Sequence, residues 1–390
     1  MRKFRKLPFA LPQIGQKEID EVIHTLSSGW LTSGPKVDRL EADFSDYIGS
    51  DFALAVNSAT SGLHLALEAC GIGPGDKVVT TPYTFTATAE VIHYLGAEAV
   101  FADIDPRTFT LDPSSLIRVV EAQKDVKAVI PVHFAGQACD MGPILSIAGE
   151  YALRVVEDAA HALPTTYDNQ LVGTIGDLTV FSFYATKTLS TGEGGMVVTN
   201  NKEYADRMRI MRLHGINRDV FNRCGSGVPD WYYEVMEPGF KYNMPDIAAA
   251  IGIHQLRKAD IFQSRREEIA QKYTTAFSNL PLTGPWLERP SDKHSWHLYV
   301  IQLELEHLTI TRDRFIELAA EAGVGTSVHF IPLHLHPYWR DRYGFKPSDF
   351  PVCYQVFQRV VSLPIYPGMT DEDVDFVIRT VRRILLRHAK

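Results

Sequence analysis

A single lysine, Lys187, stands in a turn of small polar residues between two apolar runs. The runs, 178–183 (LTVFSF) and 196–198 (MVV), predict two buried strands that this turn connects. A lysine at the end of a buried strand is poorly hydrated, which lowers its pKa and leaves more of its amine neutral and nucleophilic. Lys187 is therefore a candidate for forming a Schiff base with a carbonyl group. A lysine taken alone is more often a solvated surface residue, so this interpretation depends on the rest of the chain.

Two carboxylates and a histidine follow another apolar run, 153–156 (LRVV). Glu157 and Asp158 are costly to bury unless each has a partner. As alternatives, Asp158 could cap a helix and His161 could be a core histidine. A carboxylate that faces a pyridine nitrogen keeps it protonated, which makes the ring an electron sink. Together with Lys187, this pattern indicates pyridoxal 5'-phosphate, a cofactor that needs a lysine, such a carboxylate and a phosphate site.

A candidate phosphate site lies near the beginning of the chain. The apolar run 52–56 predicts a strand, 57–62 (NSATSG) a turn of small residues, and 63–70 an apolar helix. Hydroxyl groups and free N–H groups at a helix N-terminus can hold a phosphate. Ordinary helix capping by Ser58 or Thr60 is the alternative. The turn does not have the GxxxxGK[ST] pattern, so nothing supports a nucleoside triphosphatase.

Strands and helices alternate along the first part of the chain. Further strands are expected at 77–80, 99–103 and 128–132, and helices at 13–28, 35–48, 84–95, 113–122 and 141–150. This alternation predicts an α/β fold with a mostly parallel central sheet that helices cover on both faces. In such sheets the site lies beyond the carboxyl ends of the strands. The residues that follow the strands, Lys187 among them, are therefore expected to meet.

The second part of the chain predicts a smaller unit. Residues 214–242 are irregular and are followed by an apolar helix at 243–256 that continues, more charged, to about 277. Residues 281–290 resemble a linker. After them, a strand near 325–330 and a final helix from Thr370 indicate a small α/β domain. We predict a large domain at 1–280, whose first 50 residues pack on the small domain or on a dimer interface, and a small C-terminal domain at 281–390.

Composition excludes several classes of function. The net charge of −8 leaves no basic surface for nucleic acid, and no apolar run is long enough to span a membrane. The basic N-terminus has only a short apolar part broken by prolines, which argues against a signal peptide. Distant cysteines without a CxxC pair indicate reduced thiols in a cytoplasmic protein; these are Cys70, Cys139, Cys224 and Cys353. His329, His334 and His336 lie close in sequence, but no carboxylate or thiol completes a set of ligands, so we expect no metal site.

Segments spread over almost the whole chain resemble the fold-type I pyridoxal phosphate enzymes, and more narrowly the DegT/DnrJ/EryC1/StrS family of nucleotide-sugar aminotransferases. The segments are SGWLTSGP at 28–35, NSATSGLHLAL at 57–67, DIDP at 103–106, VEDAAHA at 156–162, FSFYATKTLSTGEGG at 181–195, PGFKYNMPDIAAAIG at 238–252 and VHFIPLHLHPYW at 328–339. The resemblance implies that Lys187 forms the Schiff base with the cofactor and, once released, moves protons between cofactor and sugar. It also implies that Asp158 pairs with the pyridinium nitrogen and that His161 lies near the ring hydroxyl.

The remaining implied roles concern the phosphate, the ring face and the substrate. Thr60, Ser61 and Ser182 would hold the phosphate, and Phe85 would stack on the ring. Asn243 would reach the phosphate from the neighbouring subunit, so that a homodimer shares each site. The candidate substrate contacts are His329 and Trp30, although a tryptophan in a turn such as 29–35 more often covers the core.

The motif spacing is closest to enzymes that aminate 4-keto sugars linked to UDP, with L-glutamate as the amino donor and a ping-pong mechanism. One alternative is a sugar dehydratase of the same fold, but such enzymes carry a histidine at the position of Lys187. Another pyridoxal phosphate enzyme, such as a desulfurase, would need an activated cysteine that the sequence does not indicate. A non-catalytic regulator that keeps only the fold is the third alternative; the set of Asp158, Ser182 and Lys187 argues against it.

Overall fold

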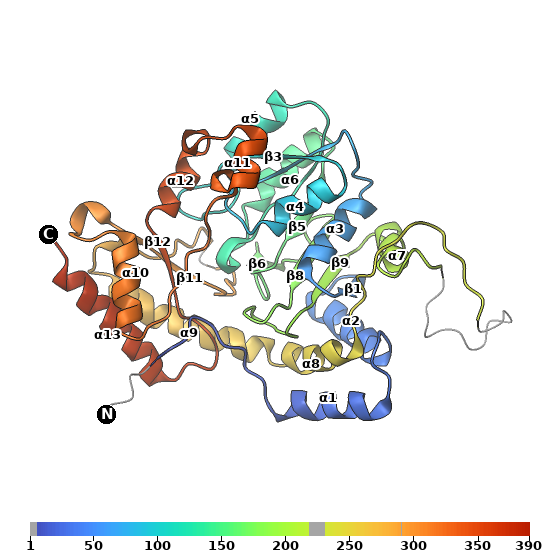
Figure 1. Ribbon diagram of the computed structural model, residues 1–390, viewed down its shortest axis with the longest axis horizontal. Helices are drawn as coiled ribbons and strands as arrows, with labels where there is room; N and C mark the ends of the chain where they lie inside the picture. Colours follow the sequence, from blue (N-terminus) through green and yellow to red (C-terminus); the bar gives the residue numbers. More distant parts are fainter. Residues whose placement is uncertain (1–5, 218–230, 290) are drawn as a thin grey trace.

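The computed structural model describes residues 6–217, 231–289 and 291–390 (Figure 1). Its main sheet has seven strands in the order β1-β9-β8-β5-β4-β2-β3. The strands are β1 (Phe52–Val56), β2 (Lys77–Thr80), β3 (Glu98–Phe101), β4 (Val126–Val129), β5 (Arg154–Asp158), β8 (Leu178–Ser182) and β9 (Gly195–Thr199). Strand β9 pairs antiparallel with both of its neighbours, and the other pairs in this sheet are parallel. The predicted α/β fold with a mostly parallel sheet is confirmed.

Helices cover both faces of this sheet, as the unbroken apolar runs predict. One face packs against α3 (Ala59–Ala69), α4 (Ala87–Tyr94) and α7 (Lys202–Met211), and the other against α5 (Pro113–Ala122) and α6 (Met141–Glu150). Neighbouring residues of one strand point to opposite faces: Val78 packs in the core on the α3 side and Val79 in the core on the α5 side. Both are fully buried, which explains why the strands lack polar alternation.

The N-terminal helix α1 (Gln16–Ser28) is present as predicted, but its apolar side faces outward. Its buried residues are Glu18 and Thr25, and Glu18 pairs with Lys258. By contrast, Ile19, Ile23 and Leu26 are 46%, 55% and 52% exposed. Helix α1 lies along α8 (Asp246–Leu256), as does α2 (Pro35–Ile48). An apolar stripe on the outside of a folded chain indicates a surface that another molecule covers.

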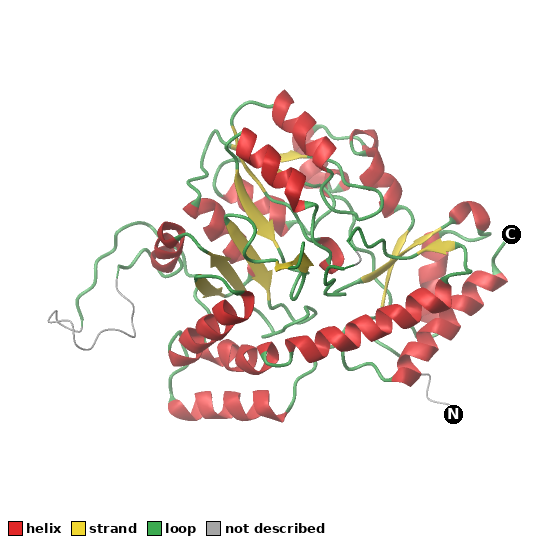
Figure 2. Ribbon diagram, turned by 180° about the vertical axis from the view of Figure 1, so that it is seen from behind, coloured by secondary structure: helices red, strands yellow, loops and turns green. Residues whose placement is uncertain are grey.

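The C-terminal part is built around a second sheet of β10 (Leu282–Thr283), β11 (Tyr299–Leu303) and β12 (Val360–Leu363). Helices α9 (Ala259–Phe277), α10 (Arg312–Glu321) and α13 (Asp371–Arg387) share its hydrophobic core. Helices α8 and α9 run one after the other along the molecule and connect the two sheets (Figure 2). The final helix begins as predicted, with the Thr370 side chain accepting a hydrogen bond from the Asp373 N–H. Two short helices, α11 (Pro337–Tyr343) and α12 (Pro351–Phe357), complete this part.

One predicted element of this part is wrong. Residues 325–330 do not form a strand; a single bridge joins Ser327 to Ser362 of β12. The segment leaves the sheet after Ser327, because His329 and Phe330 turn into a cavity beside the main sheet. Strand β12, which was not predicted, is the last strand of this sheet, and Ser327 lies beside it. The boundary between domains at 280/281 stays a prediction.

Residues 218–230 of the predicted irregular segment, including Cys224, lie outside the described residues. The other cysteines, Cys70, Cys139 and Cys353, form no disulfide. Among the described residues, every helix is too short or too polar to cross a lipid bilayer.

Candidate active site

A cavity of about 450 Å³ opens at the carboxyl ends of the central strands. The predicted residues that line it are Thr60, Phe85, Asp158, His161, Ser182, Lys187 and His329. Most of them follow a strand of the main sheet directly or after one turn, so the rule for parallel sheets places them at one edge. His329 reaches the cavity from the C-terminal part. The structure therefore brings together seven predicted side chains that are scattered over the sequence from 60 to 329.

Lys187 stands in the turn between β8 and β9, at the wall of the cavity. The turn closes through the Phe183 N–H, which donates to the Gly194 carbonyl oxygen at 2.9 Å, and the Lys187 N–H donates to Tyr184 O at 2.9 Å. The side chain is half-buried. Burial lowers the pKa of Lys187 from 10.5 to about 8, although the nearby carboxylate of Asp158 acts in the opposite direction. The neutral fraction of its amine near physiological pH is therefore much larger than that of a free lysine.

Asp158 ends β5 and is held in place from several sides. Its Oδ2 accepts a hydrogen bond from Thr88 Oγ1 at 2.7 Å, and its Oδ1 accepts one from the Ala160 N–H at 3.1 Å. The carboxylate is 5% exposed. Thr88 comes from α4, so a helix on one face of the sheet orients a carboxylate at the end of a central strand. The result is a fixed negative charge close to Lys187.

The neighbouring carboxylate, Glu157, points away from the cavity. It is fully buried, and its Oε1 accepts hydrogen bonds from the Gly176 N–H at 2.8 Å and Thr179 Oγ1 at 2.7 Å. His133 receives the Cys139 N–H on Nδ1, so its proton is on Nε2, 2.8 Å from Glu157 Oε2. Glu157 therefore organises the sheet interior, and Asp158 is the carboxylate available for chemistry.

The N-terminus of α3 forms the wall that a phosphate can bind. Ser58 caps the helix, and Thr60 and Ser182 contribute hydroxyl groups to the lining. Strand β9 comes very close to this turn: a Cβ at Gly195 would lie 2.9 Å from the Ala59 nitrogen. Only glycine allows that approach. The first N–H groups of a helix have no acceptor within it, so they are available to an anion.

Among the predicted phosphate contacts, Ser61 is directed away from the cavity, and its role at the phosphate stays a prediction. Its hydroxyl donates to Asn57 Oδ1 at 2.7 Å, and its N–H donates to Ser58 Oγ at 3.1 Å. The side chain is 4% exposed and does not line the cavity. Its hydroxyl stabilises the start of α3, because the helical turn directs Thr60 toward the cavity and Ser61 away from it.

Phe85 presents an uncovered ring to the cavity. It is 59% exposed, although its ring centroid lies 6.2 Å from that of Phe330. An aromatic side chain so exposed within a cavity fits a planar ring stacked on it. Together with Asp158, Lys187 and the start of α3, this uncovered ring shows that the residues present fit pyridoxal phosphate.

Histidines form the opposite wall, and one of them was not predicted. His161, His297 and His329 all line the cavity. Burial, reinforced by the charge of Lys187, lowers the pKa of each of them, that of His329 to about 4. His161 Nδ1 accepts the Ala135 N–H at 3.3 Å, so the proton of its neutral ring is on Nε2. His297 precedes β11 in a segment without a motif; only its place just before an apolar strand could have drawn attention to it.

Besides Ser61, two predicted residues lie outside this cavity. Trp30 Nε1 donates to the Ser33 carbonyl oxygen at 3.0 Å, and Asn243 Nδ2 donates to Ser33 Oγ at 2.7 Å. Neither side chain lines the cavity of its own chain. The turn after α1 holds the Trp30 ring on the outside, 37% exposed, and its contact with a substrate stays a prediction. Ser33 nevertheless joins Trp30 to Asn243 in one surface cluster.

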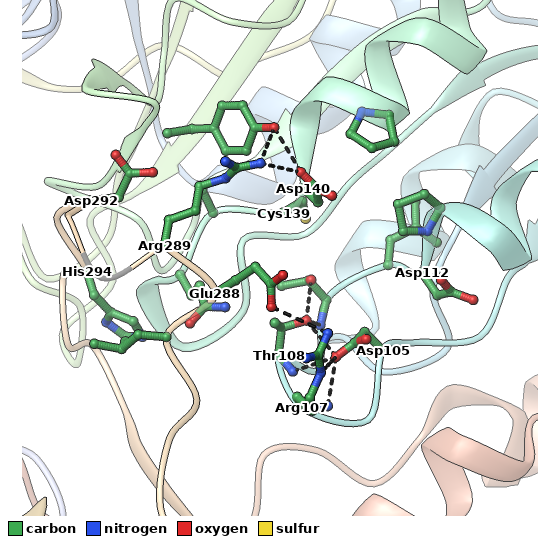
Figure 3. Close-up of a pocket in the computed structure, with 18 of the residues that line it drawn as sticks. Asp105, Arg107, Thr108, Asp112, Cys139, Asp140, Glu288, Arg289, Asp292 and His294 are labelled. Atoms are coloured by element: carbon green, nitrogen blue, oxygen red, sulfur yellow. Dashed lines mark hydrogen bonds and ion pairs between the residues drawn. The ribbon is translucent and has the colours of Figure 1, made fainter.

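A second cavity, of about 370 Å³, lies beyond β3 and β4 and was not predicted (Figure 3). Its charged side chains are largely paired with one another. Figure 3 shows Arg289 directed toward Asp140, 2.8 Å away, and Arg107 lies 3.5 Å from Glu288. The lining carries five carboxylates and three cations, so the cavity does not favour an anionic ligand.

An α/β sheet that carries a half-buried lysine, a fixed carboxylate, an open aromatic ring and a helix N-terminus at one edge defines the class of pyridoxal-phosphate-dependent enzymes. The chain belongs to the DegT/DnrJ/EryC1/StrS aminotransferase family, whose model matches residues 12–382. It is therefore an aminotransferase, and its cofactor is pyridoxal 5'-phosphate. The resemblance seen in the sequence is confirmed.

Proteins with a similar sequence or structure support this family assignment. The spore coat polysaccharide biosynthesis protein SpsC of Bacillus subtilis is 51% identical over 381 residues, which cover 97% of each chain. The putative sugar aminotransferase Spr1654 of Streptococcus pneumoniae, solved in its PMP form, has a TM-score of 0.91 and 32% identity over 98% of this chain and 99% of its own. PseC of Helicobacter pylori, an aminotransferase of pseudoaminic acid biosynthesis, has a TM-score of 0.90 and 28% identity over 98% of this chain and 100% of its own.

Proposed function

We propose that this aminotransferase moves an amino group from L-glutamate to a 4-keto sugar linked to a nucleotide, with UDP as the nucleotide. The amino sugar would enter a surface polysaccharide or a related glycoconjugate. The observation that carries the proposal is the meeting of Lys187 and Asp158 with the start of α3 in one cavity. The names of SpsC, Spr1654 and PseC support a sugar as the acceptor.

Lys187 carries the cofactor and moves the proton in this proposal. When bound, pyridoxal phosphate supplies an electron sink for a carbanion. The lysine Nζ, once released, would take the proton from the carbon that loses the amino group. It would later deliver a proton to the sugar carbon that gains the amino group. A pKa of about 8 suits both directions, because a general base works best when its pKa is near the working pH.

The other side chains bind and orient. Asp158, held by Thr88, supplies the negative charge that keeps a pyridine nitrogen protonated. Thr60 and Ser182 bind the phosphate together with the start of α3, and Phe85 stacks on the ring. His161 donates its Nε2 proton toward the ring hydroxyl. All of these residues line the cavity.

A homodimer that shares its sites is part of the proposal. The cluster of Trp30, Ser33 and Asn243 lies outside the cavity of its own chain, so it can reach a site only in another copy. The outward apolar side of α1 supports such a contact.

The direct test incubates the purified protein with L-glutamate and a panel of UDP- and dTDP-linked keto sugars. Release of 2-oxoglutarate that depends on one of the sugars is the expected result. Lys187→Ala should abolish it, together with the visible absorbance of the lysine-bound cofactor. A wild-type protein that stays colourless after addition of pyridoxal phosphate would contradict every catalytic role that we assign to these side chains.

The shared site is tested by mixing two inactive variants. Lys187→Ala lacks the reactive amine, and Asn243→Ala should retain the cofactor weakly. A mixed dimer contains one site with both native residues, so refolding the two variants together should restore up to about a quarter of the activity, the share expected from random pairing. If the mixture is no more active than its components, Asn243 does not act across the dimer.

A further inference from the structure

The wall behind His161 is built by residues 293–298, which we call the strap. It leaves the C-terminal part and pairs with the loop after β4: the Ser295 N–H donates to Gly136 O at 3.0 Å, and the Leu298 N–H to Ala135 O at 3.1 Å. Ser295 Oγ also donates to the carbonyl oxygen of His161 at 2.6 Å. The strap is thereby fixed to the residue that is predicted to meet the cofactor ring.

His297 is the side chain that the strap places in the cavity. It is 6% exposed, and its ring packs on that of His161, with 4.3 Å between centroids and an angle of 38°. The buried guanidinium of Arg266 holds the backbone from the other side; Nη1 donates to the carbonyl oxygens of Trp296 at 3.0 Å and His297 at 3.5 Å. A ring that packs on its neighbour and is carried by a fixed backbone can orient a ligand without a large entropic cost.

Only one nitrogen of His297 can meet a ligand. Nδ1 is buried and has no partner among the described residues, whereas Nε2 is not buried in this way, and the ring lines the cavity. Burial and the charges of Lys187 and Arg266 hold the pKa of His297 well below its usual range. The ring is therefore neutral, and Nε2 can donate or accept one hydrogen bond, depending on the tautomer.

The cofactor leaves this nitrogen unused. In the proposed function, the start of α3 would hold its phosphate, Asp158 would face its pyridine nitrogen and His161 would face its ring hydroxyl; all of these residues line the cavity. Among the residues that line the cavity, Lys187 is the only lysine or arginine. A neutral imidazole binds a hydroxyl group well, but it cannot compensate the negative charge of a carboxylate or a diphosphate. His297 is thus suited to the uncharged, hydroxylated part of a substrate.

From this geometry we infer that His297 is a substrate-binding residue, whose Nε2 hydrogen-bonds a hydroxyl group of the sugar. The inference rests on the proposed function and adds a contact from the C-terminal part of the chain. It also explains why a strap buries an imidazole with an unpartnered Nδ1, which otherwise costs stability.

Three variants isolate this contact. His297→Phe keeps an aromatic ring on His161 but removes Nε2, and His297→Gln places an amide group near the position of Nε2. His294→Phe is the matched control: His294 lies in the same strap, is 7% exposed and lines the second cavity instead. Any general disturbance of the strap should appear in the control as well.

The two half-reactions are measured separately on the holoenzyme. One is the loss of visible absorbance on addition of L-glutamate, and the other is its return on addition of the keto sugar that the wild-type protein accepts. Binding of the sugar nucleotide is also measured by calorimetry. We expect His297→Phe to weaken sugar binding about tenfold, as the loss of one buried hydrogen bond does, and to leave the glutamate step within about twofold. His297→Gln should recover most of the affinity.

Each other outcome contradicts the inference. If His297→Phe slows both half-reactions equally and changes the pH dependence of the visible spectrum, His297 only positions His161. If His294→Phe weakens sugar binding as much, the effect comes from the strap. If sugar binding is unchanged in His297→Phe, the contact does not exist, while the proposed function stands. A wild-type protein that reacts with L-glutamate but with no keto sugar would instead refute the proposed function, and this inference with it.

Discussion

Replacement of Lys187 by methionine should stabilise the cofactor-free protein at neutral pH. Methionine has a similar length and no charge. The folded protein lowers the pKa of Lys187 from 10.5 to about 8. A shift of one pKa unit corresponds to about 1.4 kcal/mol, so keeping this amine charged destabilises the folded state by up to about 3 kcal/mol. The half-buried side chain retains some solvent, so the measured value should be smaller.

The pH dependence gives this prediction its sign. As the pH rises from about 8 toward 10.5, the folded protein has released the proton of Lys187 while the unfolded chain still holds it. The free energy of unfolding of the wild-type protein should therefore rise as the pH increases from about 8 to 10.5. This gain in stability should be lost again as the pH falls back to 8. Lys187→Met should lack this contribution, so the two proteins should differ most at neutral pH and converge in alkaline solution.

Urea denaturation of the two cofactor-free proteins at a series of pH values measures the difference. Lys124→Met, which replaces an exposed lysine, is the control and should follow the wild-type protein. The reasoning is refuted if Lys187→Met is less stable than the wild-type protein at neutral pH. It is also refuted if the free energy of unfolding of Lys187→Met rises between pH 8 and 10 as steeply as that of the wild-type protein.

Five further substitutions test the division between structural and chemical residues. Glu157→Leu should lower the free energy of unfolding by about 3 kcal/mol, because it leaves buried donors without an acceptor, whereas Asp158→Asn should mainly reduce activity. Thermal unfolding and turnover measurements distinguish the two variants. Equal losses of stability and activity in both variants would contradict the assignment. His334→Phe should raise the melting temperature, because both ring nitrogens of this fully buried histidine lack a partner among the described residues; a clear fall would show that the imidazole has one. Ser61→Ala should lower the free energy of unfolding by about 1 kcal/mol and retain the cofactor. Thr60→Ala should weaken cofactor retention at unchanged stability, which dialysis followed by absorbance measures. The reverse pattern would indicate that Ser61, and not Thr60, binds the phosphate.

Much of the site was predictable because its residues follow strands. Apolar runs and turn residues are local signals, and in a parallel sheet the ends of all strands meet at one edge. Phe85, Asp158, Ser182 and Lys187 could thus be placed together before any contact was known, and the structure places them in one cavity. The periodicity of the helices was equally local, and α2, α5 and α6 have the expected bounds.

Side-chain direction required the tertiary structure. Adjacent residues on a strand or a helix turn point to different surroundings, so Asp158 faces the cavity and Glu157 the sheet interior. In the same way, Thr60 faces the cavity, while the hydroxyl of Ser61 donates to Asn57 at the start of α3. The pattern of α1 predicted a helix correctly but could not tell that its apolar side faces outward, because periodicity identifies a face and not what covers it.

Contacts between distant segments were also beyond the sequence. His297 packs on His161 because the strap pairs with the loop after β4, and no local pattern records a pairing between segments so far apart. The physical reason is that secondary structure follows from the preferences of neighbouring residues, whereas the neutral histidine wall, the lowered pKa of Lys187 and the outward position of Asn243 follow from burial, which only the packed chain determines.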